Sequence, residues 1–318
     1  LCMNAKTVAE GTLFNISQFG AGGMFTSMFI GFIVAFIYKC MVRFSFFGED
    51  SVIPDFVKNW FDNIISIFLS LLAGYLLTFT FNIDVFAMVQ VVMSPIKGFA
   101  QSLPGVILIC FLQNIFYFFG ISGWVFTPVT RSITQAAIAE NAAMVAAGGT
   151  ATNIYAYGFS RYHHIGGQLA TLPLAFMMLF SKSKKYKLLG RATIIPSIFN
   201  INEPLVYGTV VNNPFMFIPV VLISIILPGF SYLWFQFGWG TINYVNFDMN
   251  FLPNAISAFM MSGGDFRNVI LVLINIVLAT LIWYPFFKAS EKFEVTKDAE
   301  REKQKASKKA AKKLAVQE

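Results

Sequence analysis

The sequence predicts an all-α membrane protein that crosses the bilayer several times. Hydrophobic residues make up 56% of its 318 residues and charged residues only 12%, whereas soluble domains have about 25% charged residues. Several apolar runs approach the ~20 residues that a helix needs to cross the hydrocarbon core. We therefore expect a multi-pass membrane protein in contact with lipid.

The net charge of +7 is concentrated in two places, residues 181–191 and the tail from Lys288 to Glu318. Basic blocks beside apolar spans are typical of the cytoplasmic side, so we expect the tail to be cytoplasmic. Membrane topology explains this charge without a nucleic-acid partner. The basic loop could also steer an acidic protein toward the membrane.

Metal and disulfide chemistry are not indicated. Cys2, Cys40 and Cys110 are far apart and lie in or near apolar stretches, and His163 and His164 are the only histidines. This spacing fits neither a disulfide framework nor a zinc site. No glycine-rich phosphate loop or dinucleotide signature occurs, and we expect no cofactor.

The first part of the chain alternates apolar runs with polar connections. Residues 1–23 are polar and glycine-rich, and the mixed-charge stretch 43–58 contains Pro54, which we expect to break any helix there. We predict spans at 24–42, 61–81 and 103–120, and an interfacial helix at 82–101, where Asp84, Gln90 and Lys97 recur at helical spacing.

Residues 121–168 are too polar and broken for lipid, yet too apolar for a solvated loop. Irregular backbone at membrane depth is tolerated where protein or a water-filled cavity covers it. Arg131 and Glu140 are nine residues apart, which is not a helical pair spacing, and we expect them to meet only across a hairpin. Gly148-Gly149-Thr150 favours flexible packing over phosphate binding.

We predict an apolar helix at 169–180, spans at 214–234 and 269–287, and a glycine- and asparagine-rich loop at 237–266. The tail from Glu291 has alternating charges, which indicate a solvated helix face. The two basic blocks should share one side of the membrane. The two spans between them satisfy this condition only if residues 192–211 enter and leave on one side, as a re-entrant hairpin.

The motif Asn200-Ile201-Asn202-Glu203-Pro204 lies in that hairpin. From Glu203 to Asp248 the chain carries no other formal charge, and an ionisable group at mid-membrane costs at least about 2.5–3.5 kcal/mol. Such residues usually mark a functional site. The plainer alternative is a glutamate at the membrane interface or one buried with a satisfying partner.

This motif resembles that of the EIIC permeases of the sugar phosphotransferase system, in the lactose/cellobiose/diacetylchitobiose branch. Gly20-Ala21-Gly22-Gly23-Met24-Phe25 resembles the family's glycine-rich approach to a helix. Gly166-Gly167-Gln168-Leu169-Ala170 resembles the glycine-rich run before its basic cytoplasmic loop, and Asn212-Asn213-Pro214 fits the pattern after the motif. The resemblance covers nearly the whole chain and implies a multi-pass protein of the bacterial plasma membrane.

The resemblance implies a homodimeric EIIC fold in which an oligomerisation domain supports a transport domain with re-entrant hairpins. We expect residues 1–101 to belong to the scaffold, 102–288 to the sugar-binding transport domain and 289–318 to a charged cytoplasmic tail. Family members are longer at the N-terminus by roughly three spans, so the chain resembles a truncated member.

The implied function is to carry a disaccharide such as cellobiose, lactose or diacetylchitobiose across the membrane. A separate EIIB protein, charged by EIIA, then phosphorylates the sugar through a phosphocysteine. This chain has no phosphorylatable cysteine in a strand-to-helix context, so the two proteins act together as the phosphotransferase.

By this resemblance Asn200, Asn202 and Glu203 bind the sugar, and we hypothesise that Glu203 holds the acceptor hydroxyl and takes its proton. Carboxylates and amides are suitable partners for sugar hydroxyls. The branch usually has Gly-Ile-His-Gly where this chain has Gly120-Ile121-Ser122-Gly123, so a hydroxyl replaces a sugar-contacting imidazole. His163 and His164 could compensate for this change, or serve a structural role.

Aromatic residues near the expected site include Trp124, which we place among the sugar-binding residues. For Trp124, Tyr155, Tyr157 and Tyr162 taken singly, interfacial anchoring or packing is the plainer interpretation. Two other functions stay open. An ion-coupled secondary transporter would also have broken helices and an intramembrane glutamate, and the chain could instead be an inactive partial gene product.

Overall fold

The computed structural model describes residues 5–8, 11–14, 23–47, 53–247 and 250–314. Cys2 and the glycine-rich residues 20–22 lie outside this described part. The chain divides into two compact units, Leu1–Gly98 and Phe99–Glu318. The regular secondary structure of the described residues is helical except for one feature that the sequence did not suggest, an antiparallel hairpin of β1 (Ala5–Val8) and β2 (Gly11–Phe14).

The first unit contains α1 (Met24–Met41), α2 (Asp55–Tyr75) and most of α3 (Val85–Ala100). A π-helical turn, Leu76–Thr80, extends α2. Helix α2 begins directly after Pro54, so the expectation that Pro54 excludes a helix from 43–58 is wrong. Proline has no N–H to donate, and at the start of a helix none is needed.

In the second unit, α4 (Leu103–Phe118) is followed by a 3-10 turn, Gly123–Phe126, and by α5 (Thr127–Ala146). The expectation of a broken chain throughout 121–168 is therefore wrong for its first half. The hydroxyls of α5 donate to carbonyls of the preceding turn, as Thr130 does to Phe126 O at 3.0 Å. These local hydrogen bonds let a polar sequence remain helical. Residues after Ala146 are irregular apart from a 3-10 turn, Phe159–Tyr162.

Helix α5 ends at a glycine cap. Gly148 has φ +82°, and the amides of Gly148 and Gly149 donate to Val145 O and Met144 O, which is the geometry of a helix C-terminus. Arg131 and Glu140 both lie on α5. Glu140 accepts from Asn153, while Arg131 lies over the Tyr157 ring. These two residues therefore do not meet across a hairpin.

Helices α6 (Leu172–Leu179) and α7 (Lys184–Ile198) pack against each other. The expectation of a basic loop at 181–191 is therefore wrong from Lys184 onward, where the basic residues form the first turns of α7. With 8 residues, α6 is too short to cross a bilayer. After α7 the chain turns into α8 (Glu203–Leu205) and a π-helical turn, Val206–Val210. A Cβ on Gly208 would lie 2.8 Å from the Leu189 side chain, so this segment folds back along α7 as the expected hairpin.

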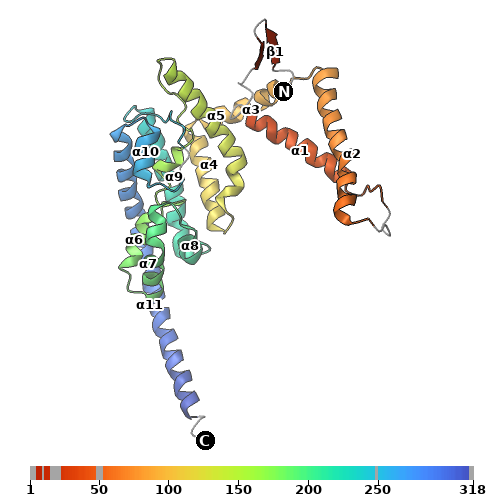
Figure 1. Cartoon of the computed structure of the whole chain (residues 1–318). Helices are drawn as coiled ribbons and strands as arrows, with labels where there is room; N and C mark the ends of the chain where they lie inside the picture. Colours follow the sequence, from red (N-terminus) through yellow and green to blue (C-terminus); the bar gives the residue numbers. More distant parts are fainter. Residues whose placement is uncertain (1–4, 9–10, 15–22, 48–52, 248–249, 315–318) are drawn as a thin grey trace. The chain divides into compact units, whose positions relative to one another are not determined.

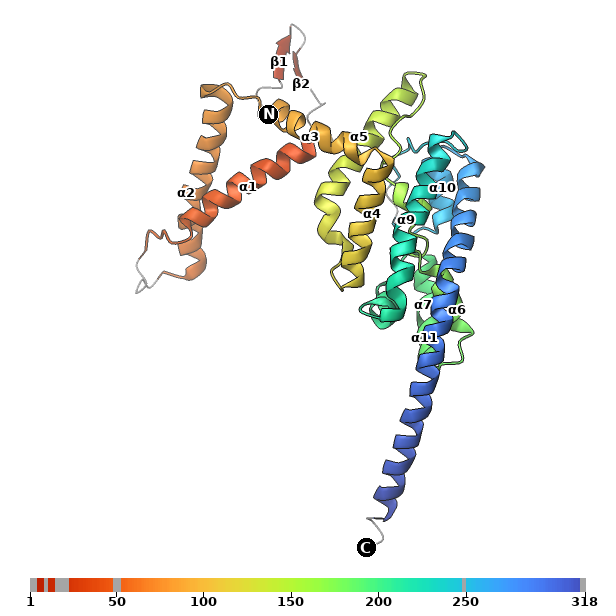
Figure 2. The same cartoon turned by 180° about the vertical axis from the view of Figure 1, so that it is seen from behind.

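The remaining helices are α9 (Pro214–Gln236), α10 (Asn254–Met261) and α11 (Phe266–Leu314). Helix α10 lies in the stretch that we expected to be a loop. Figures 1 and 2 show α9 beside α11, and α11 continuing past α6 and α7 into the tail.

One face of the tail helix is covered, which corrects the expectation of a solvated helix. Glu291 and Glu294 are buried, and Glu291 accepts a hydrogen bond from Lys182 N at 2.7 Å. Lys185 pairs with Glu294 at 3.3 Å. The basic loop is thus held against the acidic side of α11.

Among the described helices, α1, α2 with its extension, α9 and α11 are long and apolar enough to cross a membrane. A fifth span is possible if α3 and α4 are counted together. The apolar windows of α1 and α2 are only 6% buried within the chain. Such apolar faces are suited to contact with lipid or with other helices.

Candidate functional site

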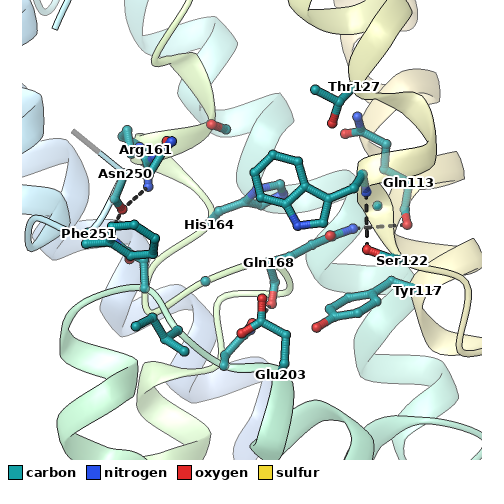
Figure 3. A pocket seen from close by; sticks show the side chains of 17 residues that line it. Gln113, Tyr117, Ser122, Thr127, Arg161, His164, Gln168, Glu203, Asn250 and Phe251 are labelled. Atoms are coloured by element: carbon teal, nitrogen blue, oxygen red, sulfur yellow. Dashed lines mark hydrogen bonds between the residues drawn. The ribbon is translucent and has the colours of Figure 1, made fainter. Parts of the chain in front are cut away.

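A polar cleft of about 420 Å³ lies within the second unit, in the size range of small-molecule sites. Its walls come from α4 and the start of α5, from residues 160–168, from the turn before α8, and from Asn250 and Phe251. Figure 3 shows the labelled side chains converging on this space from opposite sides. The cleft therefore brings together segments that are far apart in the sequence.

The two asparagines of the motif hold the cleft together. Asn200, with φ +64°, donates to Leu252 O at 2.7 Å and accepts from Gly166 N at 3.2 Å. Asn202 is 3% exposed and donates to Gln168 O at 2.5 Å and Thr171 Oγ1 at 2.8 Å. Their amides mainly fix the turn against neighbouring loops, although both residues still line the cleft.

Glu203 differs from the two asparagines in its exposure and in its hydrogen bonding. It is exposed, begins α8 and lines the cleft. Its carboxylate makes no hydrogen bond or ion pair with any of the described residues. Figure 3 shows Glu203 and Tyr117 pointing toward one another at one end of the cleft. A carboxylate left unpaired among polar groups is suited to accept hydrogen bonds from ligand hydroxyls.

The wall opposite the hairpin is formed by α4 and α5. Ser122 caps the 3-10 turn by accepting from Trp124 N at 3.4 Å, and its hydroxyl hydrogen can still be donated to a ligand. Trp124 is 65% exposed and presents an aromatic face at the rim. Gln113, Tyr117 and Thr127 complete this wall.

The neighbouring histidines face different surroundings. His164 lines the cleft, and its Nε2 is buried without a protein partner. His163 is 2% exposed, lies 3.6 Å from the Cys110 sulfur through Nε2, and contacts Phe159. The structure therefore brings His164 to the cleft but leaves His163 in the core behind it.

Several residues that line the cleft were not expected from the sequence. Gln168 donates to Gln113 O and Asn114 Oδ1, both at 3.0 Å, and Arg161 binds Asn250 through two hydrogen bonds. Gln113 could have been expected to line a site, because it is an amide within the apolar run of α4. Polar side chains in membrane spans are costly and usually functional. No comparable signal marks Arg161.

The other aromatic residues lie mainly in the interior. Tyr162 is 0% exposed and Tyr155 7% exposed, and the Tyr162 hydroxyl hydrogen-bonds Asn243 and Asn268. Packing, the plainer interpretation, fits both of these residues. Within the described part of the chain, no group of three or more His, Cys, Asp or Glu side chains could hold a metal ion.

The apolar helices and the interior polar cleft together define a helical membrane protein of the transporter class. The family model described as "Phosphotransferase system, EIIC" matches residues 1–224, which is more than half of the chain. The protein belongs to this EIIC family.

Similarity to characterised relatives agrees with this assignment. The lactose-specific EIICB component of Streptococcus mutans is 27% identical over 94% of this chain and 54% of its own length. The cellobiose-specific EIIC component of Lactococcus lactis is 29% identical over 89% of this chain and 64% of its own length. The chain thus spans between about half and two thirds of these relatives.

A solved structure has the same fold. It is the crystal structure of ChbC, the IIC component of the N,N′-diacetylchitobiose-specific phosphotransferase system. The TM-score is 0.78 and the identity 26%, over 93% of this chain and 72% of ChbC. The expected all-α EIIC fold is therefore confirmed.

Proposed function

We propose that this protein is the sugar-translocating subunit of a phosphoenolpyruvate-dependent phosphotransferase system. Its substrate would be a disaccharide such as cellobiose, lactose or diacetylchitobiose. The family assignment supports this proposal, as do the substrates in the names of the relatives. The polar, partly aromatic cleft provides both hydroxyl partners and faces for sugar rings.

The observation that carries the proposal is the difference between Glu203 and its neighbouring asparagines. Asn200 and Asn202 donate to protein groups, whereas the Glu203 carboxylate faces the cleft without such a partner. Glu203 is the first residue of α8 although Pro204 disfavours helical geometry at the preceding residue. Pro204 itself lies in the first turn of α8, where no N–H is needed. Glu203 would hold the acceptor hydroxyl and take its proton as phosphoryl transfer proceeds.

Partner proteins are part of the proposal. A cytoplasmic EIIB, charged by EIIA, would deliver the phosphoryl group, and two copies of the chain would form a homodimer. Residues 1–101 would serve as scaffold, 102–288 as transport domain and 289–318 as cytoplasmic tail. The exposed side chains of the basic loop, such as Lys187, would face EIIB.

The test is Glu203→Gln, with the full reading frame expressed beside candidate EIIA and EIIB proteins. General-base contributions are typically 10²–10⁴-fold, so phosphorylation-coupled uptake of the best of the three disaccharides should fall by at least about 100-fold. The matched control is Glu140→Gln, since Glu140 is a carboxylate on α5 that lines no part of the cleft. Vigorous uptake by the Glu203 variant would refute the role.

Uptake measurements on the same proteins also distinguish phosphotransfer from ion-coupled transport. Uptake by the wild-type chain should require phosphoenolpyruvate and yield a phosphorylated sugar. Accumulation of unmodified sugar driven by a proton gradient, in vesicles lacking phosphoenolpyruvate, would favour the secondary transporter.

A further inference from the structure

Helix α11 continues far beyond its apolar part. Residues 268–287 carry no formal charge, and at 1.5 Å per residue they span about 30 Å, which is the thickness of the hydrocarbon core. The helix then runs from Lys288 to Leu314, which is about 40 Å further. Figures 1 and 2 show the last part of α11 extending past α6 and α7, where no other described helix of its unit lies beside it. This part of the helix is therefore open to a soluble partner.

The first half of this extension is engaged within the chain. Residues 288–300 contain three basic and four acidic side chains. Glu291 and Glu294 are buried, and they pair with Lys288 at 2.8 Å and Lys185 at 3.3 Å. The charges of this half are largely balanced, and its acidic side faces its own chain rather than a partner.

The second half, residues 301–314, has the opposite character. It contains seven basic residues and one acidic residue, so its net charge is +6. Lys305 and Lys309 are spaced i,i+4, as are Lys308 and Lys312, and like charges at this spacing destabilise a helix by about 0.2–0.5 kcal/mol per pair. An anionic partner would relieve these repulsions.

A bilayer surface is poorly placed to be that partner. Residue 301 lies about 20 Å beyond the end of the apolar run, and the headgroup region adds only about 5–8 Å to each side of the hydrocarbon core. The Debye length is about 8 Å at physiological ionic strength. Attraction between anionic headgroups and residues 301–314 is therefore largely screened, whereas a soluble protein can approach this part of the helix from any side.

From this charge distribution we propose that residues 301–314 are a docking element for a soluble protein with an acidic surface, and that this protein is EIIB. The inference rests on the proposed function, which places the tail and EIIB on the same side of the membrane. Long-range attraction raises the rate of encounter and fixes orientation. None of the residues that line the cleft belongs to α11, so the tail acts on the delivery of EIIB and not on the sugar.

The test measures sugar phosphorylation by the full chain in vesicles as a function of EIIB concentration. The variant is Lys305→Gln/Lys308→Gln/Lys309→Gln/Lys312→Gln, which keeps α11 helical because glutamine and lysine have similar helix propensities. The KM for EIIB should rise by at least about 10-fold, the lower end of steering effects, while kcat stays within about two-fold. The matched control replaces the same four lysines by arginine, which keeps the charge and should keep the wild-type KM.

Salt and lipid composition distinguish a protein partner from a lipid partner. The advantage of the wild type over the glutamine variant should shrink as the Debye length falls from about 10 Å at 0.1 M salt to about 3 Å at 1 M. This advantage should be the same in vesicles of phosphatidylcholine alone and in an equal mixture with phosphatidylglycerol. If it occurs only in the anionic vesicles, the tail binds lipid and the docking proposal is overturned.

The two proposals fail in different ways. If the sugar is phosphorylated and the glutamine variant has the wild-type KM for EIIB, only the docking proposal is wrong. If the folded wild-type chain phosphorylates none of the three disaccharides with any candidate EIIB, the proposed function fails and the docking proposal fails with it.

Discussion

The Asn202 side chain lies directly against the backbone of Gly167. A Cβ on Gly167 would approach Asn202 Cγ to 2.4 Å, and Gly167 has φ +98°. This contact joins the turn that carries Glu203 to the loop that carries His164 and Gln168. The geometry of the cleft therefore depends on a glycine at position 167.

Gly167→Ala should weaken disaccharide binding by at least about 10-fold, or ~1.4 kcal/mol. The new methyl group must displace Asn202, whose hydrogen bonds to Gln168 O and Thr171 position the turn. Calorimetric titration of the purified variant measures the effect.

Gly148→Ala is the matched control for backbone strain. Gly148 has φ +82° and nothing within 4 Å of an added Cβ. Gly148→Ala should lose about 1–2 kcal/mol of stability because an L-residue disfavours this backbone region. Gly167→Ala should lose more, because it also disturbs the hydrogen bonds of Asn202, and only the Gly167 variant should lose affinity. Wild-type affinity in Gly167→Ala would show that the Asn202 contact does not shape the site.

Ser122→His tests the departure from the branch pattern. Ser122 is half-buried and lines the cleft, and its hydrogen bond to Trp124 N is long at 3.4 Å, so the fold should tolerate the change. An added hydrogen bond is worth about 0.5–1.5 kcal/mol. We expect roughly 2- to 10-fold tighter binding of at least one of the three disaccharides.

Titrations of the wild type, Ser122→His and Ser122→Ala with the same sugars provide the comparison. Ser122→Ala should bind more weakly than the wild type because it has no hydroxyl. If the histidine and alanine variants have the same affinities, position 122 does not contact the sugar.

The turn after α7 and the position of Glu203 beside the cleft could be predicted because their signals are local. Two prolines, two amides and one carboxylate interrupt an apolar run, and charge parity requires the chain to return to the same side. The roles of the asparagines could not be predicted in this way. Asn200 donates to the carbonyl of Leu252, 52 residues away along the chain. Nothing within the motif indicates that its amides bind other parts of the protein while its carboxylate makes no such contact.

The adjacent histidines illustrate the same limit. His163 and His164 have the same residue type and the same sequence neighbourhood, yet one contacts Cys110 and the other lines the cleft. The contact with Cys110 places His163 against α4, whereas His164 lines the cleft. Tertiary contacts supply this information.

The acidic face of α11 should hold the basic loop in place. Glu291 accepts from Lys182 N at 2.7 Å, and Asp298 accepts from Ser183 Oγ at 2.8 Å. Hydrogen bonds to charged groups contribute about 1.5–3 kcal/mol each. Glu291→Ala/Asp298→Ala should therefore release the loop and make it several-fold more sensitive to trypsin.

Limited digestion followed by mass spectrometry locates the cut after Lys182, Lys184 or Lys185. Glu300→Gln is the control, since Glu300 is on the same helix and exposed. Equal cleavage rates in the double variant and the control would show that the carboxylates do not restrain the loop.

Asp265, in the turn between α10 and α11, should make stability depend on pH. Its carboxylate accepts from Thr241 N at 3.0 Å, Thr241 Oγ1 at 2.7 Å and Arg267 at 2.9 Å. Burial alone would raise the pKa of Asp265, but the hydrogen bonds from Arg267 and Thr241 outweigh it and hold this pKa well below the usual value.

Because the pKa of Asp265 is lower in the folded state, the unfolded chain takes up this proton first as the pH falls. The stabilisation is complete above the unfolded-state pKa of about 3.9 and is lost progressively below it. Asp265→Asn should therefore lower the melting temperature at pH 7, and its difference from the wild type should shrink below about pH 4. Melting curves of the detergent-purified proteins between about pH 3 and 7 test this, and a difference that stays constant across that range would exclude the carboxylate as its source.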